Sequence, residues 1–151
     1  MLINSIKTLL VIEDSDEDFE ALKRMMQYAS IPHRLERCTD GDDALDYLYH
    51  TGKYTNKHLA HRPSLIVLDL NLPGTDGREI LQQLKQDHHL RSIPVVVFST
   101  SSNPKDIVAC YEYGVNSYIL KPIDVEKLKM TIEVLSRYWL VINALPSNEE
   151  S

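Results

Sequence analysis

The sequence contains few cysteines and lacks the long apolar runs that mark membrane proteins. Cys38 and Cys110 are the two cysteines in 151 residues, and they form no CxxC pair. Neither a zinc site nor a disulfide framework is therefore indicated. No apolar stretch approaches the ~18 residues of a membrane span. The short apolar run near the N-terminus ends in acidic residues, unlike a signal peptide. We expect reduced thiols, a cytoplasmic location and no membrane partner.

Clusters of basic residues are also missing. The net charge is −6, whereas a protein that binds a nucleic-acid backbone needs grouped Lys and Arg side chains. We therefore expect no nucleic-acid partner. The motifs GxxxxGK[ST] and GxGxxG do not occur, which removes the nucleotide-binding folds that depend on them. The length and the hydrophobic content of 43% are ordinary for one globular domain. We expect a single domain over residues 1–145 and a disordered acidic tail at 146–151.

Five strand-like runs alternate with helical patterns along the chain. Three of the runs are solidly apolar, as in strands buried on both faces of a parallel sheet. The second run alternates polar and apolar residues, as a half-exposed edge strand would. Repeated strand–helix units predict an α/β fold, a doubly wound five-stranded parallel sheet with helices on both faces. The expected strands are Thr8–Ile12, Arg34–Cys38, Leu65–Leu68, Val95–Phe98 and Tyr118–Leu120.

Several helices carry boundary signals. Asp76, with Glu79 three residues later, resembles a capping box. Asn103 precedes Pro104, which suits an N-cap followed by proline at the first helical position. Gly114 stands where a left-handed C-terminal cap is expected.

Chemically active side chains follow four of the expected strands. Glu13-Asp14 follows the first strand, Asp69 the third, Ser99 the fourth and Lys121 the fifth. In open parallel sheets, ligands bind beyond the carboxyl ends of the strands. Three carboxylates brought together repel one another unless a cation is present, and Mg²⁺ prefers oxygen ligands. Glu13 and Asp14 could simply cap a helix, so the prediction of a magnesium site rests on the agreement of all four strand ends.

The same residues carry a resemblance to a known family. An acidic pair, the stretch LDLNLPGTDG, Ser99 and Lys121-Pro122, in this order, look like the response-regulator receiver family, which has a flavodoxin-like fold. The resemblance covers residues 7–137. More narrowly, the sequence resembles small cyanobacterial response regulators that serve phytochrome histidine kinases. This narrower likeness rests on DLNLPGTDGREIL, on the loop before Pro63 and on the ending Tyr138-Trp139-Leu140.

The resemblance implies a role for each residue of the site. Asp69 would be the phosphoacceptor and, with the others, a ligand of Mg²⁺. Asp14 would bind the metal directly and Glu13 chiefly through water. Asn71 would offer its backbone carbonyl to the metal.

Other residues would bind the phosphoryl group and transmit the signal. Ser99 and Lys121 would each bind a phosphoryl oxygen, and Tyr118 would be the aromatic switch residue that follows Ser99. The Lys121–Pro122 peptide would be cis, which proline makes accessible. The expected protein is a single-domain response regulator rather than an enzyme. It would take a phosphoryl group from a histidine kinase, lose it by slow autodephosphorylation and signal through a change of surface. The narrower resemblance implies a phytochrome-type kinase.

Three rival interpretations fit the residues less well. A haloacid-dehalogenase-type phosphatase needs a second aspartate where Asn71 stands. A flavodoxin-type FMN carrier needs a loop rich in hydroxyls and glycine where the sequence reads EDSDED. The remaining alternative is a receiver-like binding module that works without phosphorylation, and the intact acids, Asp69 and Lys121 argue against it.

The C-terminal helix, expected from about residue 125 to 145, has two apolar stripes on nearly opposite faces. A helix that is apolar on both faces either is buried or meets a partner. We expect the first stripe to pack on the sheet and the second to form a homodimer interface, with kinase docking as the alternative. The first stripe is Val125, Leu128, Ile132, Leu135, Trp139 and Ile142, and the second is Met130, Val134, Tyr138, Val141 and Leu145.

Overall fold

Five parallel strands form the centre of the structure, a computed structural model that describes residues 6–31, 33–56 and 60–146. Their order across the sheet is β2-β1-β3-β4-β5, and the neighbouring strands are parallel. The order changes direction between β1 and β3, which is where a ligand site is expected. The expected disordered tail falls, from residue 147 on, outside the described residues. The strands are β1 (Lys7–Ile12), β2 (His33–Cys38), β3 (Leu65–Leu68), β4 (Val95–Ser99) and β5 (Ser117–Leu120).

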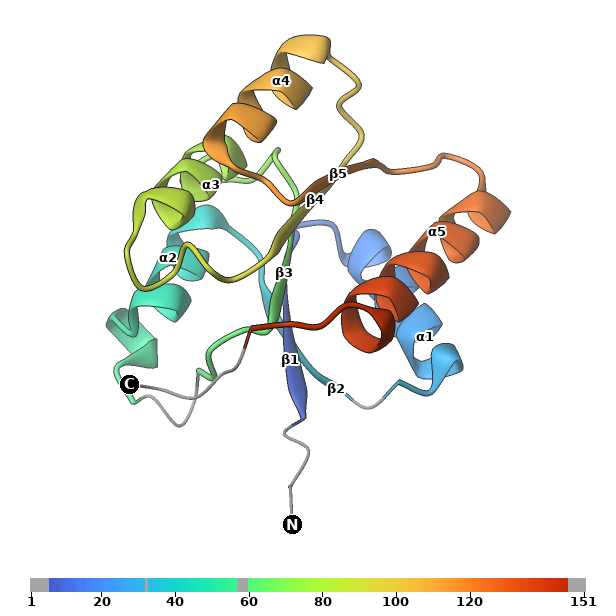
Figure 1. Cartoon of the computed structure of the whole chain (residues 1–151), viewed down its shortest axis with the longest axis horizontal. Coiled ribbons are helices and arrows are strands. Elements are labelled where there is room, and N and C mark those ends of the chain that lie inside the picture. The colour runs from blue at the N-terminus through green and yellow to red at the C-terminus, as the bar shows by residue number, and fades with distance from the viewer. Residues whose placement is uncertain (1–5, 32, 57–59, 147–151) are drawn as a thin grey trace.

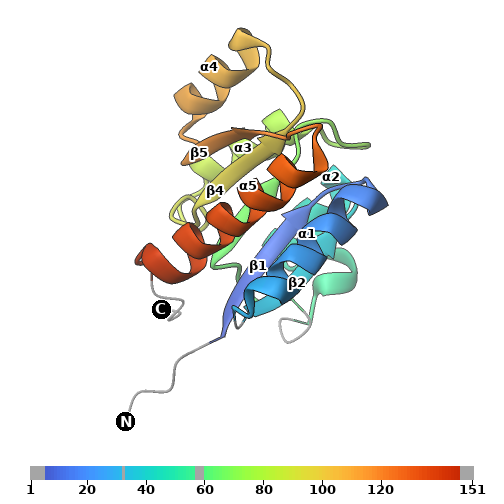
Figure 2. The same ribbon diagram turned by 90° about the vertical axis from the view of Figure 1, so that its right-hand side faces the viewer.

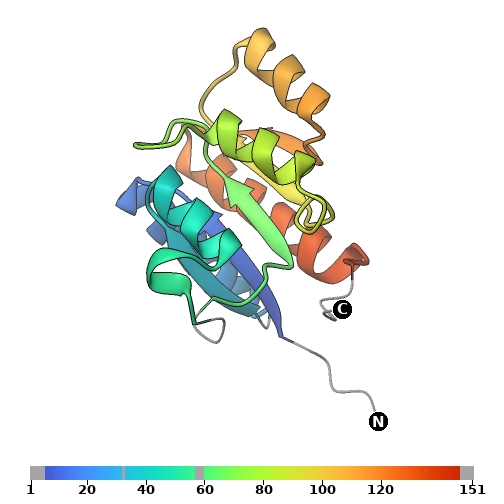
Figure 3. The same ribbon diagram turned by 90° about the vertical axis from the view of Figure 1, so that its left-hand side faces the viewer.

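Helices cover both faces of this sheet, as predicted. Figure 1 shows α1 and α5 on one face and α2, α3 and α4 on the other. In the turned views, α1 and α5 lie side by side in Figure 2, and α2 and α3 face the viewer in Figure 3. No helix in the described ranges is both long and apolar enough to cross a bilayer. The helices are α1 (Asp16–Ala29), α2 (Gly41–Tyr49), α3 (Gly77–Gln86), α4 (Pro104–Tyr113) and α5 (Val125–Arg137), with a 3₁₀ turn at Gly52–Tyr54.

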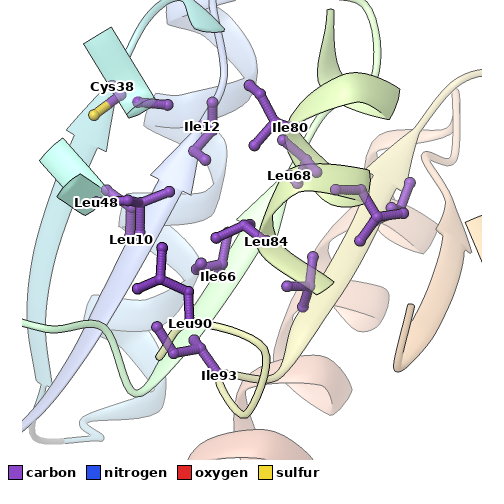
Figure 4. Close-up of a cluster of buried hydrophobic side chains, with 14 of the residues drawn as sticks. Leu10, Ile12, Cys38, Leu48, Ile66, Leu68, Ile80, Leu84, Leu90 and Ile93 are labelled. Atoms are coloured by element: carbon purple, nitrogen blue, oxygen red, sulfur yellow. The ribbon is translucent and has the colours of Figure 1, made fainter. Parts of the chain in front are cut away.

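The sheet separates two hydrophobic cores because successive strand residues point to opposite faces. Leu10 packs with Ile66 and Leu84 in the core under α2 and α3 (Figure 4). Leu9 packs with Met26 in the core under α1 and α5. All residues of β3 and β4 are buried, whereas β2 is mostly half-buried. The prediction of central apolar strands beside a half-exposed edge strand is confirmed.

The predicted caps at Asn103, Gly114 and Asp76 are confirmed, although Asp76 does not form the predicted capping box. The Asn103 side chain caps α4 ahead of Pro104, and Gly114 ends that helix with a φ of 102°. Asp76 caps α3, and its carboxylate accepts a hydrogen bond from the backbone nitrogen of Arg78. In a capping box this bond would come from the third helical residue, Glu79, and here it comes from the second, Arg78.

The C-terminal helix begins at Val125 as expected, but its regular part ends at Arg137 and a π-helical turn follows at Tyr138–Ile142. Ile132 and Leu135 are buried against the sheet. Val125 and Ile142, at the two ends of the predicted packing stripe, are exposed. Val125 lies in the first turn, before the part of the helix that reaches the core.

A wider turn explains the altered C-terminal end of that stripe. A π-turn adds a residue per turn, so Leu140 is buried where regular spacing had predicted Ile142. On the second stripe, Met130, Val134, Tyr138 and Val141 are exposed. Leu145 instead packs against the core. Leu145 is only half-buried and so still reaches the surface, and its assignment to the interface stays a prediction.

Candidate functional site

The carboxyl ends of the strands bring three acidic side chains together. Glu13 and Asp14 follow β1, and Asp69 follows β3, the strand beside it. One carboxylate oxygen from each residue lies within 4.8 Å of the others. Glu13 is 4% exposed and Asp69 7% exposed, while Asp14 is exposed. The convergence that the strand ends predicted is thus present.

Lys121 offsets part of the negative charge of this acidic cluster. Its Nζ lies 2.6 Å from Glu13 Oε1 and 3.2 Å from Asp69 Oδ2. Nζ also lies 2.9 Å from Asp18 Oδ2, in the first turn of α1. The Lys121 side chain is 7% exposed, so a buried ammonium meets three acids. Sequence reasoning missed Asp18, and the acidic run EDSDED, which continues into the helix, was the available signal.

Burial and the ion pairs shift the pKa values of Glu13 and Lys121 in opposite directions. Burial disfavours the ammonium of Lys121, but hydrogen bonds to Glu13 and Asp18 outweigh it, and the pKa of Lys121 is raised. Burial raises the pKa of the Glu13 carboxyl to about 7, against the lowering effect of Lys121. A divalent cation favours the ionised form of a neighbouring carboxylate. The geometry therefore matches a site that is completed by a cation.

Ser99 and Tyr118, the two residues of the expected switch, each form a hydrogen bond with the backbone of Ser101. Ser99 is fully buried, and its Oγ accepts a hydrogen bond of 3.2 Å from the backbone nitrogen of Ser101. The Tyr118 hydroxyl donates a bond of 2.8 Å to the carbonyl oxygen of Ser101. The β4–α4 segment therefore links Ser99 to Tyr118.

Two further expectations concern the backbone around the site. Asn71 is exposed, and its backbone nitrogen lies 3.4 Å from Asp69 Oδ1. The described residues contain no cis peptide bond. The Lys121–Pro122 peptide is therefore trans, and the expectation of a cis peptide there is wrong. The trans form is intrinsically favoured by about 0.5–1 kcal/mol at such bonds. In this form the backbone nitrogen of Lys121 donates to Ser99 O at 2.8 Å while its ammonium reaches the acids.

The donor atoms suit a hard divalent cation. Carboxylate oxygens are the ligands that Mg²⁺ prefers, and this ion usually keeps several of its waters. An exposed Asp14 beside the buried Glu13 and Asp69 leaves the cluster open to solvent on one side. Within residues 6–31, 33–56 and 60–146, no other group of three or more acidic, histidine or cysteine side chains has comparable spacing. The residues present therefore fit a metal.

This fold and this acidic site are those of a receiver domain. The family model of the response regulator receiver domain matches residues 9–133, and the chain belongs to that family. Response regulator Rcp1 of Synechocystis sp. is 39% identical over 144 residues, which are 95% of this chain and 96% of Rcp1.

Solved structures extend the likeness to the fold. The Mn(2+)-bound form of Rcp1 has a TM-score of 0.89 at 39% identity, over 93% of this chain and 99% of that one. The phosphorylated cyanobacterial phytochrome response regulator RcpA has the same TM-score and identity, over 95% and 100% of the two chains. RPA3017 from R. palustris, a response regulator in red light signaling, has a TM-score of 0.85 at 34% identity, over 94% and 99%. The chain is a response regulator related to those of phytochrome systems, in a family that binds a divalent metal.

Proposed function

We propose that this protein accepts a phosphoryl group on Asp69 from a histidine kinase, with Mg²⁺ bound at Glu13, Asp14, Asp69 and the backbone carbonyl of Asn71. One observation carries the proposal. The carboxylate of Asp69 lies at the end of a buried strand, beside the ammonium of Lys121 and two further acids. This arrangement places a nucleophile next to the positive charge that phosphoryl transfer requires.

The chemistry uses groups that are already in the required ionic form. A carboxylate oxygen of Asp69 attacks the phosphorus in line, and the bond from phosphorus to the imidazole nitrogen of the donor breaks. The ammonium of Lys121 and the hydroxyl of Ser99 stabilise the equatorial oxygens. Bound Mg²⁺ supplies further positive charge to these oxygens. No general base is needed because the nucleophile is a carboxylate oxygen and not a hydroxyl that must lose a proton. We expect slow autodephosphorylation, in which water attacks the same phosphorus, the bond to the Asp69 oxygen breaks, and inorganic phosphate and the free carboxylate result.

The output is a change of surface that begins at Ser99 and Tyr118. A ligand shifts an equilibrium only if it binds the two states differently. Phosphoryl binding by the Ser99 hydroxyl draws the β4–α4 segment toward Asp69 and alters the place of the Tyr118 ring. The shared contact at Ser101 supports this coupling. NMR signals of Tyr118 that are identical with and without beryllofluoride, a phosphoryl mimic, would contradict it.

The upstream partner that we propose is a phytochrome-type histidine kinase. Response regulators of phytochrome systems take phosphoryl groups from histidine kinases, and the names of RcpA and RPA3017 place those relatives in phytochrome or red-light signalling. We expect phosphorylated phytochrome-type kinase to transfer its phosphoryl group to this protein faster than an unrelated histidine kinase does. Equal transfer rates would remove the phytochrome assignment and leave the receiver function intact.

The second partner that we propose is another copy of this chain, in a homodimer. Met130, Val134, Tyr138 and Val141 form an exposed apolar stripe on α5 and the turn after it. The stripe borders a groove of about 360 Å³ beside Ile119 of β5. An apolar stripe of this kind marks an interaction surface more often than scattered exposed residues do.

Incubation with Mg²⁺ and acetyl phosphate tests the phosphoacceptor. We expect the wild type to gain the mass of one phosphoryl group, and the variant Asp69→Asn to gain none. Asp87→Asn, at the far end of α3, is the matched control and should label normally. Labelling of Asp69→Asn, or labelling unaffected by excess EDTA, would overturn the proposal. A wild type that gains no mass would support the phosphorylation-independent binding module instead.

A further inference from the structure

Each polar atom of Ser101 takes part in a hydrogen bond. Its nitrogen donates to Ser99 Oγ, and its carbonyl oxygen accepts from Tyr118. Its Oγ donates to Asp106 Oδ2 at 2.6 Å and lies 3.4 Å from the backbone nitrogen of Asn103. A half-buried loop residue is thus held between the proposed phosphoryl-binding hydroxyl and the first turn of α4.

An ion pair anchors the far end of this chain of contacts on a second helix. Arg78 in α3 makes a bidentate pair with Asp106, with Nε 2.8 Å from Oδ1 and Nη2 2.9 Å from Oδ2. Its Nη1 donates to Asp76 Oδ1 at 3.0 Å. The helices α3 and α4 lie next to each other (Figure 1). A bidentate guanidinium–carboxylate pair is among the strongest and most directional hydrogen-bonded contacts, so Ser101 is tied to two helices.

Capping does not require these contacts. The Asn103 side chain already caps α4 through the backbone nitrogen of Lys105. Asp76 caps α3 through the backbone nitrogen of Arg78. The bonds that Asp106 accepts from Ser101 and from Arg78 are additional to both caps. Their distinctive consequence lies at Ser101, where they hold the backbone that contacts Ser99 and Tyr118.

We infer that Arg78, Asp106 and Ser101 are positioning residues that restrain Ser99 and thereby favour the unphosphorylated state; this rests on the proposed function. Because the Ser101 nitrogen is hydrogen-bonded to Ser99 Oγ, a movement of Ser99 toward a phosphoryl group on Asp69 would carry Ser101 along and stretch or break its bond to Asp106. The restraint therefore lowers the affinity of the protein for a phosphoryl group. Since a coupling between two sites is reciprocal, weakening the restraint makes the protein bind a phosphoryl mimic more tightly.

Beryllofluoride titration in the presence of Mg²⁺ tests this inference, with binding followed through the NMR signals of Tyr118. We expect Ser101→Ala and Arg78→Met each to bind beryllofluoride more tightly, by roughly threefold to tenfold. In the unliganded variants, the signals of residues near Ser99 should lie partway along the line between the free and bound wild-type positions. A merely structural change would displace them off that line.

Matched controls lie at the amino ends of the strands. Arg62 Nη2 lies 3.3 Å from Ser92 Oγ, so Ser92→Ala and Arg62→Met remove the same atoms at a distant site. Neither control should change the affinity for beryllofluoride. Unchanged or weaker binding by both test variants would overturn the inference, and the second variant decides if one fails to fold. A wild type that binds no beryllofluoride and gains no phosphoryl group would instead overturn the proposed function.

Discussion

The backbone oxygen of Asp69 lies so close to Gly77 that a β-carbon on Gly77 would approach it to 2.4 Å. Real β-carbons do not come this near to a backbone oxygen, and Gly77 is the first residue of α3. Its nitrogen donates to the carbonyl oxygen of Leu70 at 3.0 Å. The lack of a side chain at Gly77 therefore lets α3 begin directly against the proposed phosphoacceptor.

Gly77→Ala should displace Asp69. We expect the free energy of unfolding to fall by about 1–3 kcal/mol, as for other overpacked sites, and labelling by acetyl phosphate to slow. Chemical unfolding and mass spectrometry measure the two effects. Gly114→Ala is the control, because φ there is 102° while the nearest atom would lie 3.6 Å away. It should lose stability but keep the wild-type labelling rate, and equal slowing in both variants would argue against a local effect at Asp69.

Lys121→Met should separate metal binding from phosphoryl transfer. The ammonium of Lys121 offsets part of the negative charge of Glu13 and Asp69, and it repels a divalent cation on the same carboxylates. We expect the variant to bind Mg²⁺ about tenfold more tightly, an effect within the range for charges this close in a partly buried site. Labelling by acetyl phosphate should nevertheless decrease. Calorimetry with Mg²⁺ and mass spectrometry measure the two quantities, and weaker metal binding would show that Lys121 mainly maintains the fold of the site.

The pair of Arg78 and Asp106 should make stability depend on pH in the acid range. Hydrogen bonds from Arg78 and Ser101 lower the pKa of Asp106 to about 2, from an ordinary value of 3.8. Because this pKa is lower in the folded state, the contribution to stability is present above about pH 4 and is lost as the pH falls toward 2. Partial exposure reduces it to about 1 kcal/mol.

Urea unfolding between pH 2 and 5 measures this contribution. We expect Asp106→Asn to flatten the acid loss of stability relative to the wild type. Asp87→Asn, which changes an aspartate away from this pair, should leave the loss in place. An identical pH profile in the wild type and Asp106→Asn would contradict the lowered pKa.

The double variant Val134→Glu/Tyr138→Glu should abolish the proposed homodimer. The two substitutions place charges in the apolar stripe on α5, where burial of an unpaired charge is costly. Sedimentation of the wild type and the variant, each with beryllofluoride and Mg²⁺, measures the assembly. Val108→Glu/Tyr111→Glu alters a similarly exposed pair on α4 and should remain dimeric. A monomeric wild type at high concentration would remove the dimer, and a dimeric Val134→Glu/Tyr138→Glu variant would place its interface elsewhere.

The sequence alone was sufficient for the parts of this protein that depend on local pattern. Solid apolar runs such as Val95–Phe98 identify strands that are buried on both faces. Asn103-Pro104 and Gly114 mark helix ends because capping depends on a few neighbouring residues. The rule that the carboxyl ends of parallel strands share one edge predicts that Glu13, Asp69 and Lys121 lie together.

Only the tertiary structure decided which distant groups complete the site. Asp18 is one acid among several at a helix start, yet the Nζ of Lys121, the residue after β5, lies 2.9 Å from its Oδ2. The ion pair between Arg78 and Asp106 depends on how α3 and α4 pack together. No local spacing encodes contacts between residues that lie 103 or 28 positions apart.

Tertiary packing also decided the conformation of residues 138–145. Regular helical spacing predicted that Ile142 packs inward and that Leu145 joins the exposed stripe. A π-helical turn over Tyr138–Ile142 instead buries Leu140, and Leu145 contacts the core. The ammonium of Lys7, at the start of β1, donates to the backbone oxygen of Leu140. Periodicity assumes one fixed number of residues per turn, and a long-range contact of this kind lies outside what periodicity can predict.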